Sequence, residues 1–242
     1  MKNTDTKIAV ITGGNSGIGY ATARRLKETG TEVIITGRRK DAVENAATEL
    51  DITGIVADQS NLTDINRLAA SVHEKYGKID MLLINAGITK IASIETTSEE
   101  MFDEVMNVNL KGAFFTLSTF IPFLNNGASV VFLSSTSARI SPPNASVYAA
   151  SKAAVNAIMK IAAIELAPRK IRVNAVSPGP VSTEIMDKMG MNKDLESKMV
   201  NSIPLMRFGK PDEVASLISY LLGDEALFIT GSDFLIDGGQ TV

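Results

Sequence analysis

The sequence predicts an α/β fold, a doubly wound parallel sheet flanked by helices on both faces. Short runs rich in Val, Ile and Leu alternate with longer segments of helical periodicity. The runs are apolar at nearly every position, which is typical of strands buried on both faces of a sheet. Such strand–helix–strand units form right-handed crossovers between parallel strands. A glycine-rich turn directly after the first run is also typical of this fold class.

Seven apolar runs are predicted strands, because each is short and enriched in β-branched residues. They cover residues 7–12, 32–36, 53–57, 80–85, 129–134, 172–177 and 234–236. The predicted helices cover residues 17–29, 40–50, 61–76, 98–124, 147–167 and 211–222. Gly30 and Gly77 follow the first and third helices, where glycine commonly ends a helix. Ser98 suits a helix start, Pro168 a helix end, and Pro211 the first helical turn.

The stretch from 183 to about 204 lacks a strand pattern and carries four methionines among charged residues. It is either a surface helical excursion or a flap over a pocket, where flexible methionines adapt to an apolar ligand. We assign residues 184–205 to this candidate flap. The chain contains no linker, repeat or low-complexity segment, so we expect residues 1–242 to form a single dinucleotide-binding and catalytic domain.

Composition excludes several classes of function. The chain of 242 residues has 45% hydrophobic residues and a net charge of −3, which does not favour nucleic acid as a partner. It has no cysteine and one histidine, His73, which we interpret as a surface residue near a helix end. We therefore expect no metal site and no serine–histidine triad. With no signal peptide or apolar run of membrane-spanning length, we expect a cytoplasmic protein with no membrane partner.

The glycine-rich turn reads Thr12-Gly13-Gly14-Asn15-Ser16-Gly17-Ile18-Gly19. Glycines at a strand-to-helix turn let backbone N–H groups approach a pyrophosphate, and the helix start adds a favourable dipole. The spacing Gly-x-x-x-Gly-x-Gly differs from the more familiar Gly-x-Gly-x-x-Gly. Turn formation alone would explain the glycines, but their place after the first strand of a doubly wound fold favours a dinucleotide site.

Tyr148 and Lys152 stand four residues apart, on one face of a predicted helix. An ammonium beside a phenol favours phenolate and lowers a pKa that is about 10 in free tyrosine. Such a tyrosine can exchange a proton near neutral pH. The pair alone is weak, since the same spacing occurs on many solvated helices.

Several motifs together carry a family resemblance. In chain order they are Thr12-Gly13-x-x-x-Gly17-x-Gly19, Asn85-Ala86-Gly87, Asn109, Ser135, Tyr148-x-x-x-Lys152 and Pro178-Gly179. The combination resembles the classical short-chain dehydrogenase/reductases, and the resemblance extends from Lys7 to Gly239. It implies a Rossmann-type fold that binds a nicotinamide dinucleotide.

The resemblance also implies a role for each residue. Tyr148 would be the general acid, Lys152 would lower its pKa and hold the nicotinamide ribose, Ser135 would bond the substrate oxygen, and Asn109 would position a relay water. A buried polar residue that satisfies helix backbone is the alternative for Asn109, and a turn residue the alternative for Asp58, which matches the acid that reads the adenine amine. The remaining implied cofactor contacts are Gly13, Asn15, Ser16, Gly17, Ile18, Gly19, Asn85, Ala86, Gly87, Pro178, Gly179, Val181 and Thr183.

The end of the second strand decides the cofactor. A carboxylate there would bond the ribose hydroxyls of NAD and repel a 2′-phosphate. Gly37 occupies that place, and Arg38 follows it, with a guanidinium that can pair with a phosphate. We therefore expect NADP(H) rather than NAD(H). Solvated loop charges are the alternative for Arg38 and Arg39, and the neutral Ser16 departs from members with a basic residue in the turn.

The resulting function is an NADPH-dependent carbonyl (ketone) reductase, reversible as an alcohol dehydrogenase, with a small-molecule substrate. A 3-oxoacyl-[acyl-carrier-protein] reductase is the first alternative. Asn125-Asn126-Gly127 lacks the basic residues of that subgroup, whereas Arg169 and Lys170 retain part of a basic surface. A sugar or polyol dehydrogenase and a non-catalytic NADP-sensing regulator are further alternatives. The resemblance implies a homotetramer, and the apolar C-terminal segment 228–239 fits a place at an interface and an ordinary edge strand equally well.

Overall fold

The computed structural model describes residues 6–140, 142–183 and 193–242. Its sheet has seven strands in the order β3-β2-β1-β4-β5-β6-β7, and every neighbouring pair is parallel. The strands are β1 (Ile8–Thr12), β2 (Glu32–Gly37), β3 (Thr53–Val56), β4 (Ile79–Ile84), β5 (Leu124–Leu133), β6 (Arg172–Pro178) and β7 (Asp233–Ile236). The predicted doubly wound fold is therefore confirmed.

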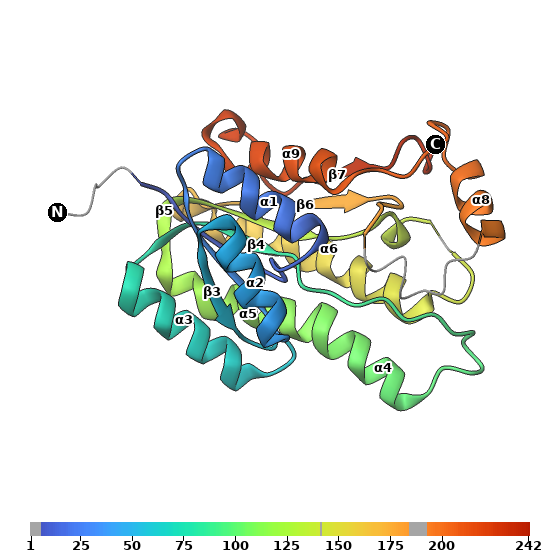
Figure 1. Ribbon diagram of the computed structural model, residues 1–242, viewed down its shortest axis with the longest axis horizontal. Coiled ribbons are helices and arrows are strands. Elements are labelled where there is room, and N and C mark those ends of the chain that lie inside the picture. The colour runs from blue at the N-terminus through green and yellow to red at the C-terminus, as the bar shows by residue number, and fades with distance from the viewer. Residues whose placement is uncertain (1–5, 141, 184–192) are drawn as a thin grey trace.

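Helices cover both faces of this sheet (Figure 1). The α-helices are α1 (Gly17–Glu28), α2 (Lys40–Leu50), α3 (Leu62–Tyr76), α4 (Glu99–Met106), α5 (Ala113–Phe120), α6 (Ser146–Leu166), α8 (Lys193–Asn201) and α9 (Pro211–Leu222). Ser98 caps α4 by accepting a hydrogen bond from Met101 N at 3.2 Å, as its place before two glutamates predicts.

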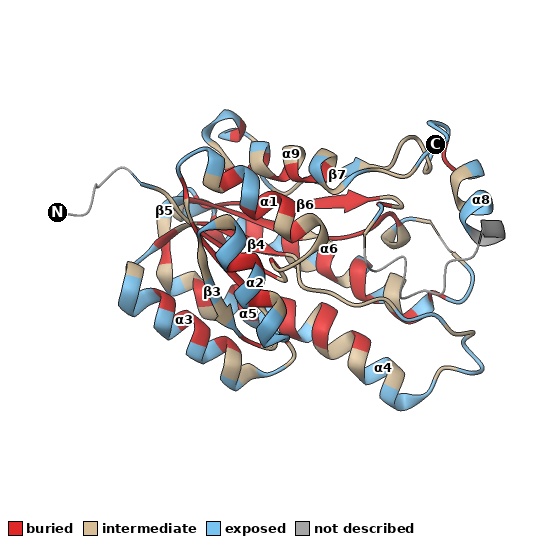
Figure 2. Ribbon diagram, in the orientation of Figure 1, coloured by how far each residue is buried: buried red, intermediate tan, exposed pale blue. Residues whose placement is uncertain are grey.

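Two apolar cores lie on opposite faces of the sheet, as the burial colours of Figure 2 illustrate. Adjacent residues of one strand serve different cores: Val10 packs with α3, α5 and α6, whereas Ala9 and Ile11 pack with α1, α2 and α9. This division follows from the alternation of side chains along a strand. It also explains why the strands are apolar at nearly every position.

The predicted long helix at 98–124 is interrupted. Between α4 and α5 the chain forms a π-helix over Asn107–Gly112, and a 3₁₀ turn over Ile121–Phe123 follows α5. Strand β5 begins at Leu124, five residues before the predicted start, with a register shift against β4. Residues 184–192 of the predicted flap lie outside the described residues, and α8 occupies part of the remainder.

Helix α6 contradicts the expectation that the chain has no apolar run of membrane-spanning length. The segment Ser146–Arg169 is long and apolar enough to span a membrane by length and composition. It packs against β6 and contributes Val155 and Met159 to one core, as a core helix of a globular domain does. Packing within the fold explains the apolar residues on its inner face, whereas Ile161 and Ile164 are exposed.

Candidate active site

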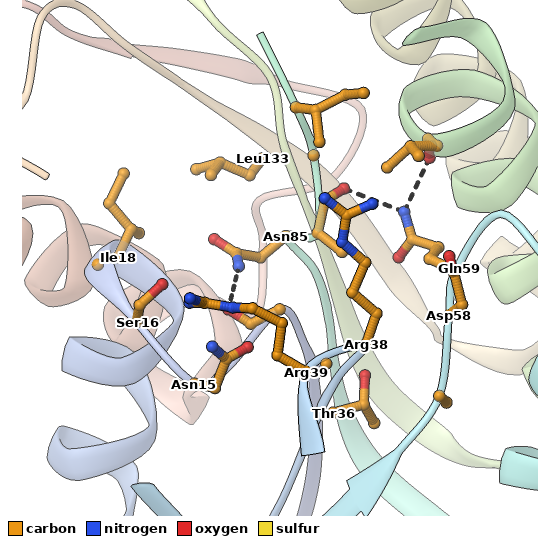
Figure 3. A pocket seen from close by; sticks show the side chains of 18 of the residues that line it. Asn15, Ser16, Ile18, Thr36, Arg38, Arg39, Asp58, Gln59, Asn85 and Leu133 are labelled. Atoms are coloured by element: carbon orange, nitrogen blue, oxygen red, sulfur yellow. Dashed lines mark hydrogen bonds between the residues drawn. The ribbon is translucent and has the colours of Figure 1, made fainter. Parts of the chain in front are cut away.

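A cleft of about 250 Å³ opens at the carboxyl ends of β1, β2 and β4, where the strand order reverses (Figure 3). This is the position at which doubly wound sheets bind ligands. Its lining residues are Gly13, Asn15, Ser16, Gly17, Ile18, Thr36, Gly37, Arg38, Arg39, Ala57, Asp58, Gln59, Asn85, Ala86, Gly87, Ile88, Val108, Leu133 and Thr183.

The glycine turn forms one wall of the cleft. Gly13 and Gly17 have φ of 63° and 55°, a backbone conformation that glycine adopts without strain. A Cβ on Gly13 would lie 2.9 Å from Ala86 Cα, so the glycine also permits close contact with the segment after β4. Asn85 ties the two segments together, since its Nδ2 donates to the carbonyl oxygens of Thr12 and Gly13 at 2.9 Å each.

The start of α1 faces the same cleft, with Ser16 at its N-cap and Gly17 as its first residue. Gly19 lies against Gly13 and Asn85 so closely that a Cβ would collide with both. Backbone N–H groups at a helix start, together with the helix dipole, suit a phosphate. The turn therefore fits the pyrophosphate of a dinucleotide.

The end of β2 places two arginines and a glycine in the wall of the cleft. In Figure 3 the side chains of Arg38 and Arg39 extend from this strand end across the cleft. A Cβ on Gly37 would collide with Asn15 Oδ1 and lie 3.0 Å from Val43 Cγ2. A carboxylate at position 37 therefore cannot be accommodated unless Asn15 moves.

Asp58 and Gln59 follow β3 on the opposite wall. Asp58 Oδ1 accepts hydrogen bonds from Ser60 N and Ser60 Oγ at 2.8 Å, which is the turn interaction expected as the alternative, and the residue also lines the cleft. Gln59 is buried, and its Nε2 donates to the carbonyls of Ala86 and Val108 at 3.0 Å each. Gln59 thus joins the π-helix to the segment after β4.

Tyr148, Ser135 and Thr89 meet beyond this cleft. The Tyr148 phenol is hydrogen-bonded to the side chains of Ser135 and Thr89, which lowers its pKa, but burial outweighs both and the net shift is upward. Ser135 caps a short 3₁₀ turn by accepting a hydrogen bond from Ser137 N at 3.1 Å. The predicted lowering of the Tyr148 pKa is therefore wrong for the chain alone, and the phenol is protonated at neutral pH.

Lys152 is buried beside this group. Its Nζ donates to Leu133 O at 2.8 Å and lies 5.8 Å from the centroid of the Tyr148 ring. Burial lowers the pKa of Lys152 from 10.5 to about 8. Leu133 also lines the cleft, so this lysine stands directly behind the cleft wall.

Asn109, in the π-helix, lies close to Lys152 and is the fourth of the predicted catalytic residues. Its amide pairs with the backbone of Ile88 in both directions, at 2.8 and 2.9 Å, and its Nδ2 donates to Ser151 Oγ at 3.2 Å. A Cβ on Gly87 would lie 3.3 Å from Asn109 Oδ1 and 3.4 Å from Lys152 Nζ. The side chains from the π-helix and α6 therefore converge on Gly87, at the edge of the cleft.

The segment after β6 closes the site on another side. Gly179 N donates to Ile236 O at 3.0 Å, and Val181 forms a parallel bridge with Gly209. Thr183 reaches the glycine turn, because a Cβ on Gly17 would lie 3.3 Å from Thr183 Cγ2. Thr183 lines the cleft, whereas Pro178, Gly179 and Val181 do not.

Sequence reasoning missed several lining residues. Gln59, Ile88 and Val108 are each adjacent to a predicted site residue, namely Asp58, Gly87 and Asn109, and Leu133 lies two residues before Ser135. This proximity in sequence was a usable signal. Thr89 had no motif, and only the structure brings it to the Tyr148 phenol.

Comparison with known proteins identifies the family. The family described as enoyl-(acyl carrier protein) reductase matches residues 13–241. The chain is 34% identical to human dehydrogenase/reductase SDR family member 4, covering 96% of this chain and 87% of that protein. It is also 34% identical to the NADP-dependent (R)-specific alcohol dehydrogenase of Lentilactobacillus kefiri, with coverages of 97% and 96%.

Solved structures agree with this assignment. The 3-ketoacyl-(acyl-carrier-protein) reductase of Brucella melitensis, complexed with NADH, superposes with a TM-score of 0.91 at 34% identity, covering 98% of each chain. These matches span nearly the whole chain. The chain therefore belongs to the short-chain dehydrogenase/reductase family of oxidoreductases.

Proposed function

We propose that the protein is an NADPH-dependent carbonyl (ketone) reductase that acts reversibly as an alcohol dehydrogenase. The observation that carries the proposal is the meeting of Ser135, Tyr148 and Lys152 beside the end of a dinucleotide-shaped cleft. A protonated phenol and a hydroxyl at this place can bind a carbonyl oxygen and supply its proton. The nicotinamide, when bound, supplies the hydride.

Each residue has a defined task in this proposal. Tyr148 donates the proton to the carbonyl oxygen, and Ser135 orients that oxygen by a hydrogen bond. Lys152 holds the nicotinamide ribose, and Asn109 fixes the π-helix next to it. The glycine turn, Asn85–Gly87 and the segment from Pro178 to Thr183 would hold the dinucleotide.

The preference for NADP(H) rests on the end of β2. Asn15 Oδ1 occupies the space beside Gly37, so an aspartate there, the usual partner of an NAD ribose, would require Asn15 to move. Arg38 lines the cleft at the same point and carries a guanidinium suited to a 2′-phosphate. The Lentilactobacillus kefiri relative is an NADP-dependent enzyme by name, which agrees with this reading.

One observation disfavours the acyl-carrier-protein alternative. Arg169 and Lys170 were the two basic residues retained for such a docking surface; Lys170 is exposed, but the Arg169 guanidinium is engaged within the fold. Its Nη1 and Nη2 donate to the carbonyls of Ile121 and Leu124, and its Nε donates to Asn126 Oδ1. The guanidinium caps the turn after α5 and is poorly placed to bind an acidic partner protein.

We also propose a homotetramer. Among the described residues, large apolar side chains are exposed at several places, including Ile91, Ile94, Leu205 and Met206. Two groups of them lie on helices and on the last strand: Phe102, Phe114 and Phe115 on α4 and α5, and Ile161, Ile164, Leu227, Phe228 and Leu235 on α6 and around β7. Exposed apolar groups in number mark interaction surfaces. The proposal assigns these two groups to the two kinds of interface of a tetramer.

The test is a screen of activated ketones, a 3-oxoacyl thioester and sugars with NADPH and NADH, alongside Tyr148→Phe. We expect NADPH oxidation with ketones, and a loss of about 100-fold or more in turnover for Tyr148→Phe because the proton donor is gone. NADPH binding by the variant should stay near normal. Tight NADPH binding without turnover on any substrate would contradict the reductase and favour the regulator.

A further inference from the structure

A buried carboxylate lies outside the set of residues described above. Asp233, the first residue of β7, has a side chain only 6% exposed. Four side-chain hydrogen bonds converge on it. Its Oδ2 accepts from Arg139 Nε at 3.2 Å, Arg139 Nη2 at 2.9 Å and Asn156 Nδ2 at 3.0 Å, and its Oδ1 accepts from Ser177 Oγ at 2.6 Å.

The three partners belong to the three segments that build the reactive end of the site. Arg139 ends the 3₁₀ turn that begins at Ser135. Asn156 lies one helical turn beyond Lys152 on α6, so Tyr148, Lys152 and Asn156 form one stripe at intervals of four. Ser177 immediately precedes Pro178, where the chain leaves β6. One carboxylate thus joins the segments that carry serine, lysine and the loop after β6.

Other contacts hold the chain before Ser135 to β6 and α6, since Ser134 N donates to Val176 O at 2.8 Å and Ser134 Oγ donates to Lys152 O at 3.3 Å. After Ser135 the backbone hydrogen bonds are local. Arg139 N and Ile140 N donate to Thr136 O, and Ala138 N donates to Ser135 O, which shapes the turn but does not anchor it to β7. Thr136 Oγ1 reaches Gln240 at 3.4 Å, a long hydrogen bond. The Arg139–Asp233 pair is therefore the strongest link between this turn and the last strand.

We propose that Asp233 and Arg139 are positioning residues that fix the Ser135 turn relative to Lys152 and the segment after Ser177. The ion pair has one half-exposed and one buried member, so its effect comes from geometry more than from Coulomb attraction. Removal of Arg139 leaves a buried carboxylate with two neutral donors, which loosens the turn. The effect on turnover rests on the proposed reductase function.

The main variant is Arg139→Gln. We expect kcat per folded chain to fall about 10-fold, because small displacements of a reacting group are costly in rate. The KM for NADPH should stay within about twofold, since no group in the cleft wall changes. Arg139→Lys should recover part of the loss, because an ammonium can still reach the carboxylate.

Arg24→Gln is the matched control. Arg24 has nearly the same side-chain exposure, 46% against 45%, and also pairs with an aspartate, Asp212, but on α1 and α9 away from the Ser135 turn. It should leave kcat unchanged. Asp233→Asn completes a double-mutant cycle: if the pair acts as a unit, the double variant loses less than the product of the two single losses.

Hydrogen exchange of the backbone amides over residues 136–140 gives a second reading that needs no substrate. We expect faster exchange there in Arg139→Gln than in Arg24→Gln, with NADPH binding preserved in both. This measurement does not depend on turnover. It therefore tests whether Arg139 holds the Ser135 turn even if the protein reduces none of the ketones in the screen. Unchanged exchange over 136–140 together with unchanged kcat would overturn the proposal.

Discussion

Lys152 places a cation where the fold disfavours one. Its side chain is buried, and this burial lowers its pKa from 10.5 to about 8. A shift of that size corresponds to about 3 kcal/mol against the charged form. The hydrogen bond from Lys152 Nζ to Leu133 O offsets only part of this free-energy cost. The site thus maintains a destabilising group for its chemistry.

A stability test follows from the sign of this shift. The unfolded chain binds the Lys152 proton more tightly than the folded chain does. The charged lysine therefore destabilises the folded state fully below pH 8, and this destabilisation decreases as the pH rises toward 10.5. Lys152→Met should raise the free energy of unfolding at pH 7 by about 1 kcal/mol, allowing for the lost hydrogen bond, and abolish turnover.

Denaturant unfolding at several pH values checks this prediction. The wild-type chain should gain stability relative to Lys152→Met between pH 8 and 10. The pKa of Tyr148 is raised in the folded chain, so ionisation of this phenol destabilises the fold only above pH 10. Both proteins carry Tyr148 and should show this loss. A constant difference between the two proteins from pH 7 to 10 would contradict the assigned pKa shift.

Arg38 carries the second prediction at this scale. Arg38→Asp should change the ratio of kcat/KM for NADPH to that for NADH by about 10- to 100-fold in favour of NADH, because a charge-assisted bond is replaced by repulsion. Lys40→Asp is the control, since it makes the same change from a positive to a negative side chain but Lys40 does not line the cleft. An unchanged ratio in Arg38→Asp would remove Arg38 from the 2′-phosphate site.

Single residues show where sequence reasoning reaches its limit. The spacing of four predicted that Tyr148 and Lys152 share one helix face, and the family resemblance implied that Ser135 lies beside them. Spacing could not show that Arg169 is occupied by backbone carbonyls, or that Asn15 fills the space beside Gly37. These facts depend on contacts between segments far apart in the sequence.

Among the elements, strand periodicity and helix caps predicted most boundaries to within a residue or two, as for α2 and α9. The π-helix was not predictable, because its cause is tertiary. Gly112 packs against Gln59 with no space for a Cβ, and Asn109 and Val108 bond to other segments. Such local widening of a helix is frequent at functional sites.

Helix α9 supplies a prediction at the element scale. Arg172, buried at the start of β6, donates from Nη1 to Leu221 O at 2.7 Å and from Nη2 to Gly223 O at 2.8 Å. It therefore caps the C-terminal end of α9, where carbonyls lack helical partners. Arg172→Leu should lower the free energy of unfolding by about 2–4 kcal/mol, because carbonyl groups lose charge-assisted bonds.

Chemical denaturation at fixed protein concentration measures this loss. The KM for NADPH of the folded Arg172→Leu protein should remain near that of the wild type, because α9 does not line the cleft. Arg207→Leu is a suitable comparison: it breaks an exposed pair with Glu213 and should cost under about 1 kcal/mol. Equal losses in the two variants would show that the capping bonds of Arg172 contribute little.

At the scale of the whole molecule, helix α6 connects the candidate site with the proposed assembly surfaces. The cleft lies at the carboxyl ends of the strands, and the two groups of exposed apolar side chains assigned to interfaces lie on α4 and α5 and on α6 and around β7. Helix α6 takes part in both, since Tyr148 and Lys152 lie near its start and Ile161 and Ile164 near its end. Assembly through its outer end would therefore brace the helix that carries the reactive pair.

This arrangement predicts stepwise dissociation. Phe114→Asp should convert a tetramer of 25.8 kDa chains into dimers held by the α6 and β7 region, and Ile164→Asp into dimers held by α4 and α5. The double variant should be monomeric, with reduced kcat, because α6 loses its support on the outer side. Asp41→Lys, on exposed α2, is the control and should remain tetrameric. Light scattering with size exclusion decides the outcome: a wild-type monomer, or single variants that keep the full mass, would reject the two-interface tetramer.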